Sequence, residues 1–100
     1  IVCAHWGGGL PFYALMPEVA EDLANVYFDT AASPVLYDAR VFSVGASLVG
    51  ADRILLGSDY PLLRCRRLLR QVLESSLTDS DKDAISGENA AALLKRMKPA

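Results

Sequence analysis

Three residues that can take part in chemistry each follow a short apolar run: His5, Asp29 and Asp59. Their separations, 24 and 30 residues, are each close to the length of one strand-helix unit. Because the carboxyl ends of parallel strands meet at one edge of a sheet, we expect the three side chains to gather at one rim. Barrels and open doubly wound sheets both bind ligands there. The spacing therefore predicts a site without choosing between these two folds.

His5 is the single histidine of the chain. An imidazole can bind a metal, act as a general base or donate a hydrogen bond, but one histidine cannot build a metal site alone. A structural histidine that caps a strand or satisfies a turn remains the alternative. Cys3 would share a strand face with His5, which makes a Cys-x-His ligand pair conceivable. A cysteine in an apolar strand is more often part of the core.

Asp59 stands in the segment Gly57-Ser58-Asp59-Tyr60-Pro61. An aspartate at a strand end can coordinate a divalent cation and accept a proton, or it can cap the helix that follows. Pro61 indicates a rigid loop, which favours a site at Asp59. For Asp29 we favour capping or a structural hydrogen bond.

The run Gly7-Gly8-Gly9 directly follows Trp6. Glycines let the backbone turn tightly or approach a ligand closely, and amides ahead of a helix could hold an anion. The spacing and the lysine or acidic partner of nucleotide-binding motifs are absent. We therefore favour a steric role beside the site.

Strand-like and helix-like stretches alternate along the chain, and this alternation predicts a parallel α/β sheet. We expect strands over residues 1–5, 26–29 and 53–57. A helix should follow the first strand, with Phe12, Leu15, Met16, Val19 and Leu23 on its apolar face; Pro17 either kinks it or begins a second helix. Further helices are expected over about 36–48, with Gly50 as its stop, over about 65–73, from a Thr78 cap to Gly87, and over about 88–97.

The chain has 100 residues, of which 52% are hydrophobic. This length allows one domain or one piece of a domain. Such a high apolar fraction predicts faces that pack on a neighbour. The net charge of −2 gives no reason to expect nucleic acid or an anionic membrane as a partner. We interpret one cluster of basic residues as a solvated helix face: Arg64, Arg66, Arg67 and Arg70.

The two cysteines, Cys3 and Cys65, form no spaced disulfide framework, which favours a cytoplasmic setting. No apolar run approaches the roughly 20 residues that span a bilayer. Because the chain opens with Ile1 in a strand-like run and without a Met, we expect upstream residues, so that residues 1–100 are a single partial domain.

Four segments, in this order, resemble the closing third of amidohydrolase-2 family proteins, the relatives of aminocarboxymuconate-semialdehyde decarboxylase. They are Ala4-His5-Trp6-Gly7-Gly8-Gly9-Leu10-Pro11, Asn25-Val26-Tyr27-Phe28-Asp29-Thr30, Ile54-Leu55-Leu56-Gly57-Ser58-Asp59-Tyr60-Pro61 and Glu88-Asn89-Ala90-Ala91. The resemblance covers almost the whole chain. It implies a TIM (β/α)8 barrel in which the three strands are the sixth, seventh and eighth, and a metal-dependent hydrolase or decarboxylase of a small carboxylate- or amide-bearing substrate.

The resemblance also implies roles for single residues. His5 would match the family's strand-six histidine, which contacts substrate or metal-bound water. Asp59 would match the strand-eight aspartate that binds the catalytic metal, usually zinc, and takes part in catalysis. Asn89 would match the closing helix. From their nearness in sequence, we expect Trp6, Tyr60 and Arg64 to shape a substrate pocket.

The sequence departs from the family in lacking its His-x-His pair and its strand-five histidine. Because a catalytic zinc site normally uses three protein ligands, the 100-residue chain is expected to be inactive alone, and unstable or homo-oligomeric. The alternative is a non-catalytic small α/β module that binds an anion at the glycine turn or serves in assembly.

Overall fold

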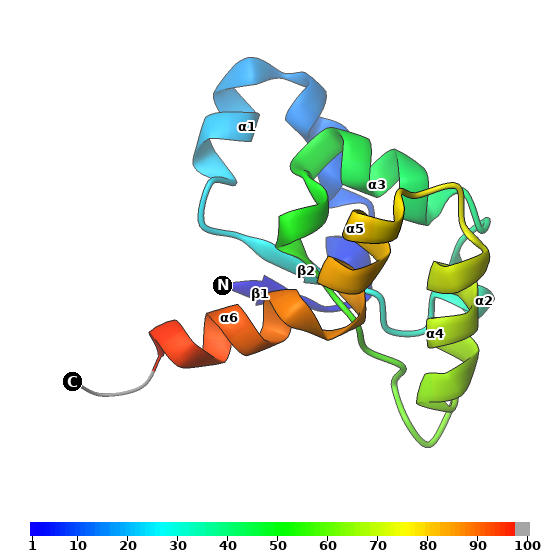
Figure 1. Ribbon diagram of the computed structural model, residues 1–100. Helices are drawn as coiled ribbons and strands as arrows, with labels where there is room; N and C mark the ends of the chain where they lie inside the picture. The colour runs from blue at the N-terminus through cyan, green and yellow to red at the C-terminus, as the bar shows by residue number, and fades with distance from the viewer. Residues whose placement is uncertain (98–100) are drawn as a thin grey trace.

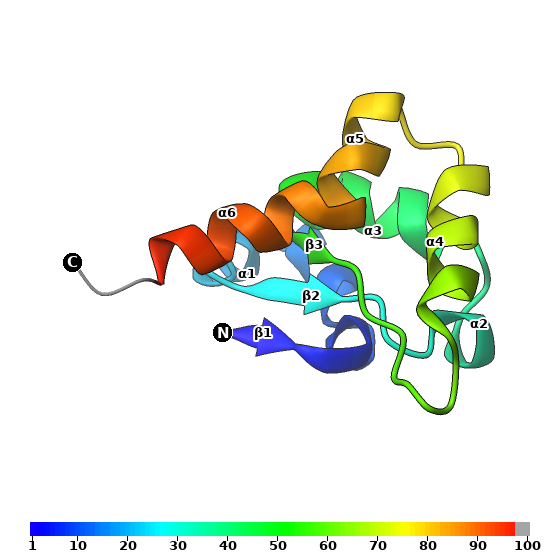
Figure 2. The same ribbon diagram turned by 60° about the horizontal axis from the view of Figure 1, so that its bottom comes forward.

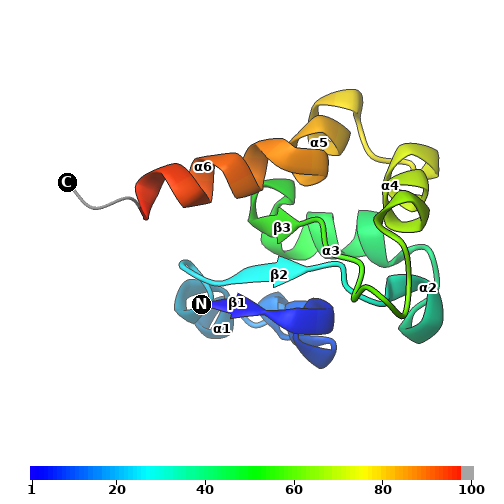
Figure 3. The same ribbon diagram turned by 90° about the horizontal axis from the view of Figure 1, so that it is seen from below.

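The computed structural model describes residues 1–97, and its centre is a parallel sheet of three strands in the order β1-β2-β3. The strands are β1 (Val2–Cys3), β2 (Tyr27–Asp29) and β3 (Ile54–Leu55). Cys3 pairs with Phe28, and Phe28 pairs with Ile54. Figure 3 shows the strands side by side in this order. The predicted α/β class is confirmed.

Helical segments connect and cover the strands. Between β1 and β2 lie the turn η1 (Ala4–Gly8), the 3₁₀ segment η2 (Leu10–Leu15) and α1 (Pro17–Asp22). Between β2 and β3 lie α2 (Ser33–Leu36), α3 (Val41–Val49) and the 3₁₀ turn η3 (Ala51–Arg53). After β3 come α4 (Cys65–Glu74), α5 (Asp79–Asp83), the π-helical segment η4 (Ala84–Glu88) and α6 (Asn89–Arg96). Figure 1 shows this path from the blue N-terminus to the red α6.

One face of the sheet carries the core. Phe28 and Ile54, neighbours across β2 and β3, are fully buried. They form one cluster with four buried side chains from the helical segments: Phe42, Leu68, Val72 and Ile85. Side chains alternate along a strand, so the other face is more open, and Val2 is 49% exposed. Within residues 1–97 the sheet thus has one covered face and one more open face, and the outer edges of β1 and β3 are unpaired.

The carboxyl ends of all three strands face the same way, toward α2 and α4 (Figure 2). This common direction is what the parallel pairing requires. It means that the segments following β1, β2 and β3 leave the sheet at one edge.

Several of the predicted elements have different boundaries, and the third strand, expected over 53–57, covers only Ile54–Leu55. The first strand ends at Cys3 and not at residue 5, because His5 and Trp6 adopt left-handed backbone angles. The helix predicted over about 36–48 begins later, as α3 at Val41, and a separate short helix, α2, already ends at Leu36. In the turn between them the Asp38 carboxylate accepts a hydrogen bond of 2.9 Å from the Arg40 amide. The predicted break at Gly87 is confirmed, because its backbone leaves helical angles at φ 178° and a kink there separates the helix that starts after Thr78 from the one that continues as α6.

Other boundaries are confirmed. Pro17 begins a second helix, α1, and Gly50, with φ 93°, ends α3. The Thr78 hydroxyl accepts a hydrogen bond of 3.1 Å from the Asp81 amide, as a helix N-cap does. The apolar face predicted on the first helix is wrong at three of its members, which are 64%, 62% and 42% exposed: Phe12, Leu15 and Met16.

Candidate functional site at the carboxyl edge of the sheet

His5 lies in a left-handed turn just beyond β1. His5 and Trp6 have φ values of 53° and 57°, a region that costs an L-residue about 1–2 kcal/mol. Gly7 continues the turn at φ 59°, and a Cβ there would lie 3.1 Å from the Leu10 Cβ and 3.2 Å from the Cys3 Cβ. The steric role that the sequence suggested for the glycines therefore holds at Gly7.

Trp6 holds this turn in place from inside the core. Its side chain is 1% exposed, its indole N–H donates a hydrogen bond of 2.8 Å to the Ser33 hydroxyl, and its ring meets Phe42 edge-on. Burying this large side chain offsets the cost of the left-handed backbone. Sequence reasoning expected Trp6 to line a substrate pocket; in the structure its ring lies in the core and is not exposed at the carboxyl edge.

Asp29, the last residue of β2, connects the His5 turn to the next loop. Its Oδ1 accepts hydrogen bonds from the amide of His5 at 2.9 Å and from the amide of Ala31 at 3.1 Å. The carbonyl oxygen of Ala31 in turn lies 3.1 Å from Nδ1 of His5. The structural hydrogen bond predicted for Asp29 is confirmed. One of its two donors is the amide of His5, the neighbouring candidate residue at this edge.

The same loop reaches the segment that carries Asp59. The buried Thr30 hydroxyl donates to the Gly57 carbonyl at 2.9 Å and accepts from the Gly57 amide at 3.0 Å. The Ala32 amide donates to the Ser58 carbonyl at 3.3 Å. His5 and Asp59 are therefore attached, through residues 29–32, to one edge of the sheet.

Asp59 is exposed and has a φ of 70°. Four residues other than glycine have positive φ in residues 1–97, and they lie at this edge: His5, Trp6, Ala32 and Asp59. Strained backbone of this kind clusters at functional sites, so its concentration here is an independent reason to place a site at the edge.

Tyr60 and Arg64 follow Asp59 on the exposed loop that leads to α4. Tyr60 is 75% exposed, and Arg64 is the N-cap residue of α4. A hollow of about 320 Å³ beside them is lined mainly by arginine side chains: Arg64, Arg66, Arg67 and Arg70. All four are exposed, which confirms the solvated helix face.

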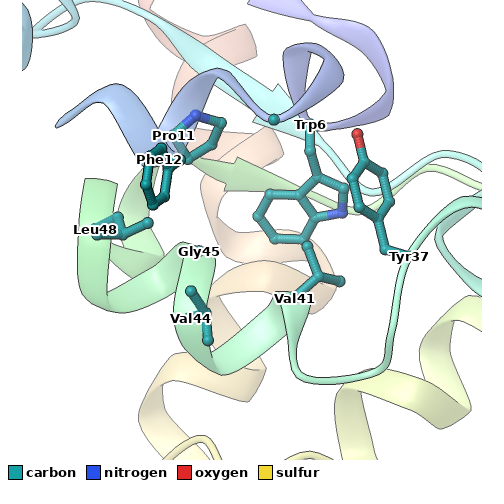
Figure 4. A pocket seen from close by; sticks show the side chains of 9 residues that line it. Trp6, Pro11, Phe12, Tyr37, Val41, Val44, Gly45 and Leu48 are labelled. Carbon is teal, nitrogen blue, oxygen red and sulfur yellow. The ribbon is translucent and has the colours of Figure 1, made fainter. Parts of the chain in front are cut away.

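A second hollow, of about 170 Å³, lies behind the His5 turn between η2 and α3. Figure 4 shows Pro11 and Phe12 on one side of it and Val41, Val44 and Leu48 on the other, with Trp6 and Tyr37 at its end. Its lining is apolar and includes neither His5 nor Asp59. We therefore place the candidate site at the edge and not in this hollow.

Tyr37, in the segment between α2 and α3, also contacts the site. Its hydroxyl donates a hydrogen bond of 2.6 Å to the His5 carbonyl, and burial raises the pKa of Tyr37 above its ordinary value. Sequence reasoning missed both Tyr37 and Ala31. No sequence motif near either residue indicates the contact, because both are far from His5 along the chain. Ala31 also binds through its backbone, so its residue type gives no indication.

Within residues 1–97, no three histidine, cysteine or carboxylate side chains come together to hold a metal ion. Cys3 and Cys65 are free thiols, and Cys3 packs against the core, which agrees with its interpretation as a core residue. The residues present do not amount to a catalytic metal site, which needs three protein ligands. No helix in the same range is both long and apolar enough to cross a membrane.

The sequence matches the amidohydrolase family over residues 1–96. The chain belongs to the amidohydrolase family. Among curated proteins none matches it. The family resemblance read from the four sequence segments is thus confirmed at the level of the family.

Solved structures show the same fold. A 2,6-dihydroxybenzoate decarboxylase from Rhizobium aligns with 98% of this amidohydrolase chain at a TM-score of 0.80 and 21% identity. A dihydroxybenzoic acid decarboxylase from Polaromonas sp. JS666, with bound manganese and the inhibitor 2-nitroresorcinol, aligns with 99% at a TM-score of 0.81 and 20% identity. A candidate amidohydrolase from Staphylococcus aureus aligns with 94% at a TM-score of 0.76 and 32% identity.

The amidohydrolase chain spans about a third of the length of these proteins: 35%, 34% and 34% of them respectively. At about 20% identity the two decarboxylases support the fold alone. The open sheet face and unpaired edges of the present chain agree with this partial coverage.

Proposed function

We propose that this chain contributes the carboxyl-edge part of the active site in a metal-dependent enzyme of the amidohydrolase family. The reaction is hydrolysis, or decarboxylation without oxidation, of a small carboxylate- or amide-bearing substrate. The observation that carries the proposal is the attachment of His5 and Asp59 to one sheet edge through residues 29–32. We further propose that residues 1–100 are the C-terminal portion of a (β/α)8 barrel, with β1, β2 and β3 as strands six, seven and eight.

His5 and Asp59 have different tasks in this proposal. Asp59, exposed and close to the open loop, supplies one carboxylate ligand to a divalent metal, zinc in our assignment, while the other ligands come from outside this chain. The metal would act as a Lewis acid and lower the cost of the negative charge that develops on the substrate. His5, whose amide donates to the Asp29 carboxylate and whose Nδ1 lies 3.1 Å from the Ala31 carbonyl oxygen, polarises the reacting group or transfers a proton.

The substrate class follows from charge. Arg64 and its neighbours form an exposed basic hollow on the segment that follows Asp59 in the chain, and arginine pairs well with carboxylates. We propose that Arg64 and Tyr60 contact the substrate, and that the substrate carries a carboxylate. Trp6 contributes to binding through the shape of the turn that it anchors. The small-molecule substrate, a cytoplasmic location and a homo-oligomeric state belong to the same proposal.

The complete reading frame offers the first test. Upstream of Ile1 we expect roughly 200 further residues with a His-x-His pair near their start, because this chain spans about a third of the length of the solved structures that it matches and barrels of that length are common. The protein made from that frame should release carbon dioxide from a hydroxybenzoate or hydrolyse an amide. His5→Gln should lower kcat by about 100-fold or more, the contribution typical of a general acid or base. A stop codon immediately before Ile1, or full activity of His5→Gln, would contradict the proposal.

A second candidate is a non-catalytic module that binds an anion or serves in assembly. The arginine hollow favours anion binding. This candidate predicts a complete short gene with a start codon just before Ile1, anion affinity that falls steeply with salt, and no effect of His5→Gln on that affinity.

A further inference from the structure

A single carboxylate oxygen holds together the two peptide segments that meet at the His5 ring. Oδ1 of Asp29 accepts the amide hydrogens of His5 and of Ala31, at 2.9 and 3.1 Å. One segment carries the imidazole, and the other carries the carbonyl oxygen that lies 3.1 Å from its Nδ1. The position of Asp29 therefore sets the relation between the ring and its hydrogen-bond partner.

That partner decides which ring nitrogen carries the proton. A carbonyl oxygen can only accept a hydrogen bond, so Nδ1 of His5 must be the donor. In a neutral imidazole the proton on Nδ1 leaves Nε2 with its lone pair free. Nε2 is then the atom that can accept a proton or a hydrogen bond at the site.

The Ala31 carbonyl is well suited to this task because its segment is fixed on both sides. The preceding residue, Thr30, is joined to Gly57 by two side-chain hydrogen bonds, and the amide of the following residue, Ala32, donates to the Ser58 carbonyl. Ala31 itself is 8% exposed. A fixed acceptor can select one tautomer, whereas a mobile one would follow the ring.

We propose that Asp29 is a positioning residue that keeps His5 in the Nδ1–H tautomer and presents Nε2 to the site. The catalytic consequence rests on the proposed function of His5. The tautomer itself does not, because it follows from the contacts of Asp29, Ala31 and His5 in the free protein. Asp29 acts through the two backbone amides that its carboxylate binds, and the hydrogen bond of the imidazole goes to the Ala31 carbonyl.

Nitrogen NMR of the protein from the complete reading frame, labelled with ¹⁵N-histidine and freed of metal, tests this assignment. The signals missing from His5→Gln identify His5. We expect the Nδ1–H form to predominate over the Nε2–H form about tenfold, the ratio that one net hydrogen bond supports. In Asp29→Ala both forms should be populated, whereas Asp29→Asn, whose amide oxygen can still accept both backbone hydrogens, should retain the wild-type preference.

Asn89→Ala is the matched control. The Asn89 amide donates two hydrogen bonds to the carbonyls of Ala51 and Ile54, at the opposite end of β3, so its loss should destabilise the protein without changing the His5 tautomer. A predominant Nε2–H form in the wild type would overturn the proposal, and so would an unchanged tautomer in a folded Asp29→Ala. If Asp29→Ala does not fold, loss of the preference in Asp29→Asn overturns it, and the wild-type preference retained in Asp29→Asn supports it.

The His5 tautomer and the proposed function can be tested separately. A protein with no hydrolase or decarboxylase activity can still show the Nδ1–H form and its dependence on Asp29. An active enzyme with the Nε2–H form would keep the function and remove the role of Asp29.

Discussion

The hydroxyl of Tyr37 donates a hydrogen bond of 2.6 Å to the backbone carbonyl of His5. It joins the segment between α2 and α3 to the left-handed turn beyond β1. Together with the Asp29–His5 amide contact, it satisfies both backbone polar groups of His5. A residue with an unfavourable φ is thus held by its hydrogen bonds as well as by the buried indole beside it.

This contact predicts a pH dependence at alkaline pH. Burial raises the pKa of Tyr37 in the folded protein above its value in the unfolded chain. The stabilisation is therefore fully present below the unfolded pKa of about 10 and is lost as pH rises through the folded pKa, because the unfolded chain releases the proton first. The free energy of unfolding should fall above about pH 10 more steeply in the wild type than in Tyr37→Phe.

Urea unfolding between pH 8 and 11, the window about the tyrosine pKa, measures this difference. Tyr13→Phe, which removes the hydroxyl of a tyrosine that is 53% exposed, is the matched control for the loss of a phenol. Identical slopes in Tyr37→Phe and the wild type would contradict the burial of the Tyr37 hydroxyl.

Gly45 of α3 is predicted to tolerate no side chain. A Cβ at this position would lie 2.5 Å from Cζ3 of Trp6, and the ring is held by Ser33 and Phe42. Gly45→Ala should therefore destabilise the protein by about 1–3 kcal/mol, the usual cost of overpacking, even though alanine favours a helix.

Gly87→Ala provides the comparison, because a Cβ at Gly87 meets no atom within 4 Å. Its free energy of unfolding should change by no more than about 0.5 kcal/mol or rise slightly. Equal effects of the two substitutions in chemical denaturation would show that the Trp6 ring is free to move, and would remove our account of how the turn is fixed.

The backbone conformation of Asp59 is predicted to lower the stability of the folded protein. Its φ of 70° suits glycine better than any L-residue, and relief of that strain is worth about 1 kcal/mol. Asp59→Gly should accordingly be more stable than Asp59→Ala by about this amount, measured by urea unfolding without metal. Both variants lose the carboxylate, so the difference reports the backbone alone. Equal stability would mean that the strain is absent.

The α/β class could be predicted from the sequence because buried parallel strands are continuous apolar runs with polar residues at their ends. Local chemistry also located Pro17 at the start of α1 and Thr78 at a helix N-cap. Each of these depends on neighbouring residues only. The family, too, could be recognised from four short segments, since their order along the chain is itself specific.

The left-handed turn at His5 and Trp6 could not be predicted in this way. Isoleucine, valine and cysteine before it favour an extended strand, and the turn forms because Trp6 reaches the core and Asp29 binds the His5 amide from 24 residues away. The same tertiary contacts explain why Trp6 became a core residue. The other ligands of the metal that we propose at Asp59 could not be predicted either, because residues 1–97 bring no three metal-binding side chains together.

The metal content of the protein from the complete reading frame tests the central claim most directly. The wild type should bind about one divalent ion per chain, and Asp22→Ala, which removes an exposed aspartate from α1, should bind the same amount. Asp59→Ala should lose most of the metal together with the activity. If Asp59→Ala keeps stoichiometric metal and full activity, Asp59 is not in the site and the account is wrong.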